Sequence, residues 1–176
     1  MPTLSVLRIL TLDESAHHDE RLRYVPVGTL QHWQQSLAWF KASRDQGGFF
    51  ERRVELVGAM KRAGVGILAG TDCGNPFCFP GFSLHDELEL LVQGGLTPME
   101  ALRAATRDPA ECLGQLDTLG TVSAGKIADL LLLEANPLDD IRNTKRVDSV
   151  VVGGRLLSRA KLHELLTGVE AAAKRH

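Results

Sequence analysis

The sequence predicts an α/β fold in two parts, residues 1–115 and residues 116–176. In the first part, segments with helical periodicity flank one short apolar run, residues 65–70. That run has no polar alternation, which is typical of a strand covered on both faces. From about residue 119, glycine and proline separate short β-prone runs, which indicates a small sheet, and a closing helix follows.

The first part opens with an apolar segment, Leu4 to Leu12, for which we expect a short strand. A polar stretch follows, and we expect its adjacent histidines, His17 and His18, to lie in a solvated loop. One amphipathic helix is predicted from Thr29, and a second ends near Gly64, where a left-handed residue commonly stops a helix.

Two further helices are predicted after the apolar run. Ser83 opens one, with Asp86 three residues on as in a capping box. Its expected buried stripe consists of Leu84, Leu88 and Leu91. Thr97 opens the next, because a cap, a first-turn proline and the capping-box acid Glu100 are all in place. A short helix is expected from Asp108.

The second part contains two β-prone runs, Ala128–Leu133 and Ser149–Val152, and Gly153-Gly154 after the second predicts a hairpin. A closing helix is expected near Arg159. Its predicted apolar face consists of Leu162, Leu165, Leu166 and Val169.

The composition is that of a globular protein: 176 residues, a net charge of -2 and 44% hydrophobic residues. The near-neutral charge gives no reason to expect a nucleic-acid partner. No apolar run approaches the roughly 20 residues of a membrane helix, so no membrane partner is expected. Residues 1–5 lack the basic and apolar regions of a signal peptide, which favours a cytoplasmic location.

Three cysteines, Cys73, Cys78 and Cys112, cannot all pair within one molecule. Reduced thiols in a reducing compartment are the simplest interpretation. Cys73 and Cys78 could alternatively indicate a soft metal site, but no second Cys or His pair stands at zinc-finger spacing, and structural thiols are favoured.

Asp72 is the residue that most suggests chemistry. It follows the predicted strand and precedes a loop rich in glycine and proline. In α/β folds, strand ends of this kind converge on a cleft where active sites form. By itself this signal is weak, and spacing alone favours a turn residue that bonds to its own loop.

Several motifs resemble the end of the amidohydrolase superfamily, in particular its imidazolonepropionase-like and prolidase-like branches. The resemblance is dense and in order over residues 60–157. It is carried by Ala69-Gly70-Thr71-Asp72, Leu84-His85-Asp86-Glu87-Leu88, Gly95-Leu96-Thr97-Pro98-Met99-Glu100-Ala101-Leu102, Ala104-Ala105-Thr106, Gly120-Thr121-Val122 and Gly125-Lys126-Ile127-Ala128-Asp129-Leu130.

The resemblance implies the C-terminal part of a (β/α)₈ TIM barrel, part of a composite β-sandwich and a terminal helix. It also implies that Asp72 is both a metal ligand and a catalytic residue. In the family this aspartate accepts the proton of the attacking hydroxide. The implied cofactor is a divalent metal, zinc in the first instance, and the implied substrate is a small molecule with an amide-type C–N bond, including a dipeptide.

The chain departs from the family in what it lacks. No His-x-His pair occurs, and a complete barrel takes about 250 residues. The sequence therefore predicts a fragment that is inactive and metal-free alone. It is expected to need a missing N-terminal half or to self-associate.

Further alternatives concern both site and function. His85, in the first turn of its helix, is a candidate substrate-binding residue, or else a partly exposed histidine at a helix start. The chain could instead be a non-catalytic remnant or a regulatory subunit that retains the fold. A receiver domain with Asp72 as phosphoacceptor is disfavoured, because the further acids and the five-fold βα repeat are absent.

Overall fold

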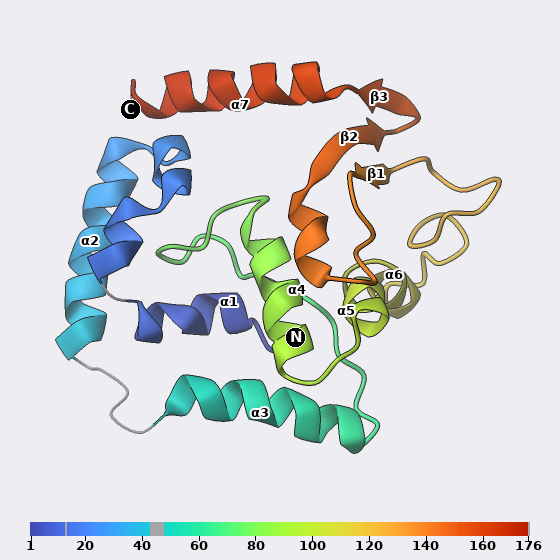
Figure 1. Cartoon of the computed structure of the whole chain (residues 1–176), viewed down its shortest axis with the longest axis horizontal. Helices are drawn as coiled ribbons and strands as arrows, with labels where there is room; N and C mark the ends of the chain where they lie inside the picture. The colour runs from blue at the N-terminus through green and yellow to red at the C-terminus, as the bar shows by residue number, and fades with distance from the viewer. Residues whose placement is uncertain (13, 43–47, 176) are drawn as a thin grey trace.

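The computed structural model describes residues 1–12, 14–42 and 48–175 of the chain. Helices predominate, and one small sheet lies toward the C-terminal end (Figure 1). The elements in chain order are α1 (Leu4–Leu7), η1 (Arg8–Thr11), η2 (Glu14–His18), η3 (Glu20–Tyr24), α2 (Val27–Ala42), α3 (Phe49–Arg62), α4 (Ser83–Gln93), α5 (Pro98–Ala105), α6 (Arg107–Cys112), β1 (Leu130–Leu133), η4 (Ile141–Lys145), β2 (Val147–Val152), β3 (Arg155–Leu157) and α7 (Arg159–Ala173), where η denotes a 3₁₀ helix.

The strand expected over Leu4–Leu12 is wrong. This segment forms α1 and η1, and the histidines expected in a loop lie in η2. The physical reason is a distant partner: the buried Glu87 carboxylate of α4 accepts backbone hydrogen bonds from Leu4 and Ser5. A carboxylate at a helix N-terminus satisfies amides that have no partner inside the helix.

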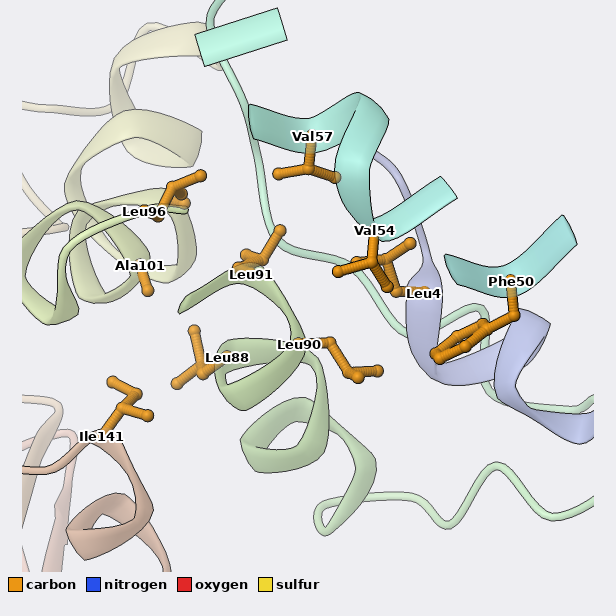
Figure 2. Close-up of a cluster of buried hydrophobic side chains, with 11 residues drawn as sticks. Leu4, Phe50, Val54, Val57, Leu88, Leu90, Leu91, Leu96, Ala101 and Ile141 are labelled. Carbon is orange, nitrogen blue, oxygen red and sulfur yellow. The ribbon is translucent and has the colours of Figure 1, made fainter. Parts of the chain in front are cut away.

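The core lies where α4 packs between α3 and α5. Figure 2 shows Leu88, Leu90 and Leu91 of α4 directed toward α3 on one side and toward the start of α5 on the other. Helices α3 and α4 approach closely at two glycines. A Cβ on Gly58 would lie 2.5 Å from the carbonyl oxygen of Gly94, so no larger residue fits at this crossing.

The strand expected over residues 65–70 is also not formed. Residues 65–72 have no strand pairing within the described part of the chain, although the backbone N–H of Ala69 donates to the carbonyl of Ala104 (2.8 Å). A strand exists only when a neighbouring backbone completes its ladder. Val65 remains exposed, in contrast to the two-sided burial that its apolar run predicted.

Helix α4 begins at Ser83 as predicted, but the capping box is wrong. The hydroxyl of Ser83 accepts from the backbone N–H of Phe79 (2.8 Å), and Phe82 occupies the N-cap without a side-chain hydrogen bond. Asp86 instead pairs with Arg21 and Lys145. Of the predicted stripe, Leu88 and Leu91 are buried, whereas Leu84 is exposed.

The start of α5 confirms the local prediction. The Thr97 hydroxyl accepts from the backbone N–H of Glu100, and the Glu100 carboxylate accepts from the backbone N–H of Thr97. Lys61 of α3 pairs with the same carboxylate at 2.5 Å. The hydrogen bonds from Lys61 and Thr97 lower the pKa of Glu100 to about 2. The capping box therefore also joins α5 to α3.

The predicted small sheet is present. It has three antiparallel strands in the order β1-β2-β3, with Leu131 opposite Val150 and Val151 opposite Leu156. Gly153 and Gly154 form the hairpin turn with positive φ at both positions (56° and 80°), a conformation that glycine adopts without strain. Asp129 fixes the turn, because its carboxylate accepts from the N–H of Gly153 (2.6 Å).

Helix α7 begins at Arg159, as expected, and Ser158 caps it. Figure 1 shows it along one edge of the molecule, where it packs against η3 and β2. Its apolar face is not covered: Leu165, Leu166 and Val169 are exposed.

Candidate functional site

Asp72 lies on the loop of residues 71–78. This loop is part of the segment that connects α3 to α4 (Figure 1). Its side chain is exposed and its φ is 51°, in the left-handed region. The side-chain amide of Asn75 donates to the Asp72 carbonyl (2.9 Å) and to Oδ2 of the carboxylate (3.1 Å). Asn75 therefore fixes the carboxylate, while Oδ1 has no hydrogen-bond partner among the described residues.

The described residues do not form a complete metal site. No group of three or more His, Cys, Asp and Glu side chains within them is arranged to hold an ion. Zinc sites normally use three or four protein ligands, so this part of the chain does not fit the metal by itself. Asp72 can supply one ligand, and further ligands would have to come from another polypeptide segment.

Two cysteines follow Asp72 on the same loop. The Sγ atoms of Cys73 and Cys78 lie 2.9 Å apart, and the Cys78 thiol also donates to the carbonyl of Thr71 (3.1 Å). Cys78 is buried and Cys73 is exposed. Burial, together with the neighbouring Cys73, raises the pKa of the Cys78 thiol to about 12. Cys78 is consequently a neutral thiol at neutral pH.

His85 lies in the first turn of α4 and is half-buried. Its Nδ1 atom is buried and has no hydrogen-bond partner within the described residues. Burial, followed by the positive charge of Lys145, lowers the pKa of His85. The imidazole is therefore neutral at neutral pH. No hydrogen bond or ion pair joins His85 to Asp72 in the part of the chain that the structure describes.

The structure assembles a charged cluster that sequence reasoning missed. Asp86 accepts from Arg21 of η3 (2.6 Å) and from Lys145 of η4 (2.8 Å), and Arg21 also pairs with Asp19 (2.7 Å). Burial acts to raise the pKa of Asp86, but the hydrogen bonds from Arg21 and Lys145 outweigh burial and leave that pKa below its usual value. The available signal was an adjacent acid pair, Asp86-Glu87, inside an apolar helix.

A cavity of about 180 Å³ lies between the N-terminal helices and the loop before α4. The charged cluster forms part of its wall, beside the rings of Phe77 and Phe79. Neither Asp72 nor His85 lines this cavity. This cavity therefore does not join the two predicted site residues.

The described residues combine helices with a small antiparallel sheet, and the loop before α4 presents the Asp72 carboxylate to solvent. Residues 51–157 match the amidohydrolase family, and the chain belongs to this family. The match includes Asp72, His85 and the three-stranded sheet.

Two relatives show what the chain is similar to. It is 41% identical over 104 residues to an ochratoxinase from Aspergillus niger, a match that covers 56% of this chain and 20% of the relative. It is 37% identical over 90 residues to an imidazolonepropionase from Caulobacter sp. (strain K31), with 49% of this chain and 22% of the relative covered.

Two solved structures extend the comparison. A bottromycin amidohydrolase superimposes with a TM-score of 0.78 at 28% identity, covering 98% of this chain and 39% of that one. A putative prolidase from Bifidobacterium longum superimposes with a TM-score of 0.56 at 39% identity, covering 66% and 30% respectively. The matched segment spans about a fifth of the length of the ochratoxinase and of the imidazolonepropionase.

None of the described helices is both long and apolar enough to cross a membrane.

Proposed function

We propose that this chain is the C-terminal portion of a metal-dependent amidohydrolase that cleaves a C–N bond in an amide, a lactam-like ring or a dipeptide. Residues 1–115 would supply the last βα units of a barrel, and residues 116–176 a segment of the composite sandwich. The metal would be zinc or a similar divalent ion. The location would be cytoplasmic.

The observation that carries this proposal is the presentation of Asp72. The residue lies inside the family match, and its carboxylate faces solvent. Asn75 donates a hydrogen bond to Oδ2, and no described residue bonds to Oδ1, which leaves that oxygen available to a ligand. A carboxylate in this arrangement can bind a divalent cation and accept a proton. His85, half-buried in the first turn of α4, would contact the substrate.

The exposed apolar surface favours an N-terminal partner. Val65 at the start of the 65–70 run, the sheet residue Leu156 and the α7 residue Leu165 are exposed, with Leu156 at 61% of its full area. Surfaces of this kind mark contact sites. The same portion would bring the ligands that this chain lacks.

The experiment compares the purified chain alone with the chain co-expressed with any neighbouring gene product that carries a His-x-His pair. Metal content and amide hydrolysis are measured for both. We expect metal and activity only in the reconstituted protein, and Asp72→Asn there to reduce kcat at least about 100-fold. Asp139→Asn, on an exposed loop of the second part, is the matched control and should retain activity.

The competing candidate is a non-catalytic remnant or interaction subunit, which the absence of a three-ligand cluster in the described residues favours. Reconstitution without bound metal would favour this candidate. Near-normal turnover of Asp72→Asn would instead show that another residue is the acid–base group. Tight stoichiometric zinc and hydrolysis by the chain alone would contradict the fragment proposal.

A further inference from the structure

The loop after Asp72 brings two thiols together from residues 73 and 78. We propose that Cys73 and Cys78 are a redox modification site, forming a reversible disulfide with a low-molecular-weight disulfide such as oxidised glutathione as co-reactant. This inference depends on the geometry of the loop and does not require the proposed hydrolase function.

The loop backbone sets the approach of the two sulfur atoms. Gly74 and Phe77 both have positive φ (120° and 59°), and Cys73 forms an isolated β-bridge with Asn75. These turns bring Cys78 back to Cys73, where the Sγ atoms lie 2.9 Å apart. A disulfide bond is about 2.05 Å long, so bond formation requires a shift of only about 1 Å.

The two thiols differ in exposure, and this difference assigns them different roles in the reaction. Cys73 is exposed, so an external disulfide can reach it, whereas Cys78 has a relative exposure of 1% and is shielded from the solvent. The hydrogen bond from Cys78 to the carbonyl of Thr71 holds its sulfur beside that of Cys73. Cys73 is therefore the residue that reacts first, and Cys78 is the one that resolves the adduct.

The chemistry balances as two thiol–disulfide exchanges. The Cys73 sulfur, after losing its proton to solvent, attacks one sulfur of oxidised glutathione. A Cys73–glutathione bond forms, and one glutathione thiol leaves. The Cys78 sulfur, after losing its proton in turn, attacks Sγ of Cys73 and releases the second glutathione. The two cysteines are oxidised, one glutathione disulfide is reduced to two thiols, and a glutathione excess reverses the reaction.

The third cysteine provides an internal comparison. Cys112 is exposed at the end of α6, and neither of the other two thiols contacts it. It can form a mixed disulfide with glutathione but has no resolving partner in the same molecule. Accessibility alone would thus give an adduct at Cys112, whereas the proposal requires an internal bond at Cys73.

A metal held by Cys73 and Cys78 is the competing use of the pair. Thiolate sites for zinc use about four ligands, and no third His, Cys, Asp or Glu joins these two in the part of the chain that the structure describes. The disulfide needs no further group, and this is why the geometry favours it.

The test incubates the reduced full chain, in dilute solution, with mixtures of reduced and oxidised glutathione. The reaction is stopped with acid, free thiols are alkylated under denaturing conditions, and tryptic peptides are analysed by mass spectrometry. The chain has no Lys or Arg between Arg62 and Arg103, so both cysteines fall in one peptide, residues 63–103. The expected product is this peptide with two hydrogens lost and no alkylated cysteine.

Three single-cysteine substitutions test the role assigned to each thiol. Cys112→Ser should oxidise like the unmodified chain. Cys78→Ser should stop at a glutathione adduct on Cys73, and Cys73→Ser should leave Cys78 free to be alkylated. From the extent of oxidation, the effective concentration of the Cys78 thiol should exceed about 1 mM, the order expected of a short flexible connection. An effective concentration well below about 1 mM would overturn the proposal. So would crosslinks formed only between chains, or glutathione adducts that persist at Cys73 in the unmodified chain.

Discussion

The backbone N–H of Ser5 donates a hydrogen bond of 2.7 Å to the carboxylate of Glu87, a residue with no exposed area, 82 positions further along the chain. The neighbouring N–H of Leu4 donates to the other carboxylate oxygen at 3.1 Å. The N-terminal helix α1 is thus held against α4 by one buried side chain. Leu4 itself packs into the core beside it.

Replacing Glu87 by alanine is expected to release α1 from the core. The variant leaves the buried amide of Leu4 and the partly buried amide of Ser5 without this acceptor, and we expect the free energy of unfolding to fall by about 2–4 kcal/mol. Glu87→Gln keeps one acceptor oxygen and should lose less. Urea unfolding at low protein concentration measures both. The surface variant Glu164→Ala in α7 should change little, and an equally small effect at Glu87 would contradict the assigned role.

The adjacent carboxyl groups of Asp86 and Glu87 in α4 should contribute to stability with opposite dependences on pH. Burial raises the pKa of Glu87 despite the hydrogen bonds from Ser5 and Leu4. Its contribution to stability is therefore complete below about pH 4 and is lost as the pH rises through the folded-state pKa. The pKa of Asp86 is lowered by Arg21 and Lys145, so its contribution is present above about pH 4 and is lost as the pH falls.

Urea unfolding across the range of about pH 3 to pH 8 separates the two groups. Glu87→Gln should remove part of the fall in unfolding free energy as the pH rises to neutral. Asp86→Asn should remove part of the fall in unfolding free energy as the pH is lowered to about 3. At neutral pH, Asp86→Asn should also lower the unfolding free energy by about 1.5–3 kcal/mol, as expected for hydrogen bonds to charged groups. Parallel pH curves for Asp86→Asn and the unmodified chain would refute this assignment.

Two glycine-to-alanine changes should alter stability in opposite directions. Gly58→Ala places a methyl group 2.5 Å from the Gly94 carbonyl oxygen, and separating α3 from α4 should lower the unfolding free energy by about 1–3 kcal/mol. Gly168→Ala, in α7, meets no atom within 4 Å and should raise it by about 0.5–1 kcal/mol. Thermal unfolding of both variants measures these changes. An unchanged unfolding free energy for Gly58→Ala would show that α3 and α4 have room for a methyl group at this crossing.

We expect the chain by itself to self-associate. Leu156 of β3 and Leu165 of α7 are exposed, and each apolar side chain left in water forgoes roughly 1.5–3 kcal/mol of stabilisation. Sedimentation velocity at several concentrations should show association that Leu165→Glu weakens. Glu164→Lys is the neighbouring control, because it changes charge without removing apolar area. A monomer at all concentrations would count against the fragment proposal.

Elements with local signals could be predicted from the sequence. The capping box of Thr97 and Glu100 needs only residues within one helical turn, and the turn at Gly153 and Gly154 needs only two left-handed positions. Both were confirmed. The family was likewise identified from motifs that the match over residues 51–157 contains.

Elements that depend on distant residues were predicted wrongly. The run from Val65 has the composition of a buried strand, but no described residues form a strand ladder with it. Leu4 begins a helix because the Glu87 carboxylate accepts a hydrogen bond from its backbone N–H, and no residue near Leu4 in the sequence predicts that contact. The assignment of Asp72 and His85 to one site also stays a prediction, because neither residue lines the cavity between the N-terminal helices and the loop before α4.

The contact between Ser5 and Glu87 also bears on the order of folding. The two-glycine turn joins strands that are neighbours along the chain, and hairpins of this kind form in about 1–10 μs. A contact across 82 residues must instead wait until a long loop has closed and α4 has formed. During synthesis on the ribosome, residues 1–12 are made before α4, yet we expect them to be among the last to reach their final place.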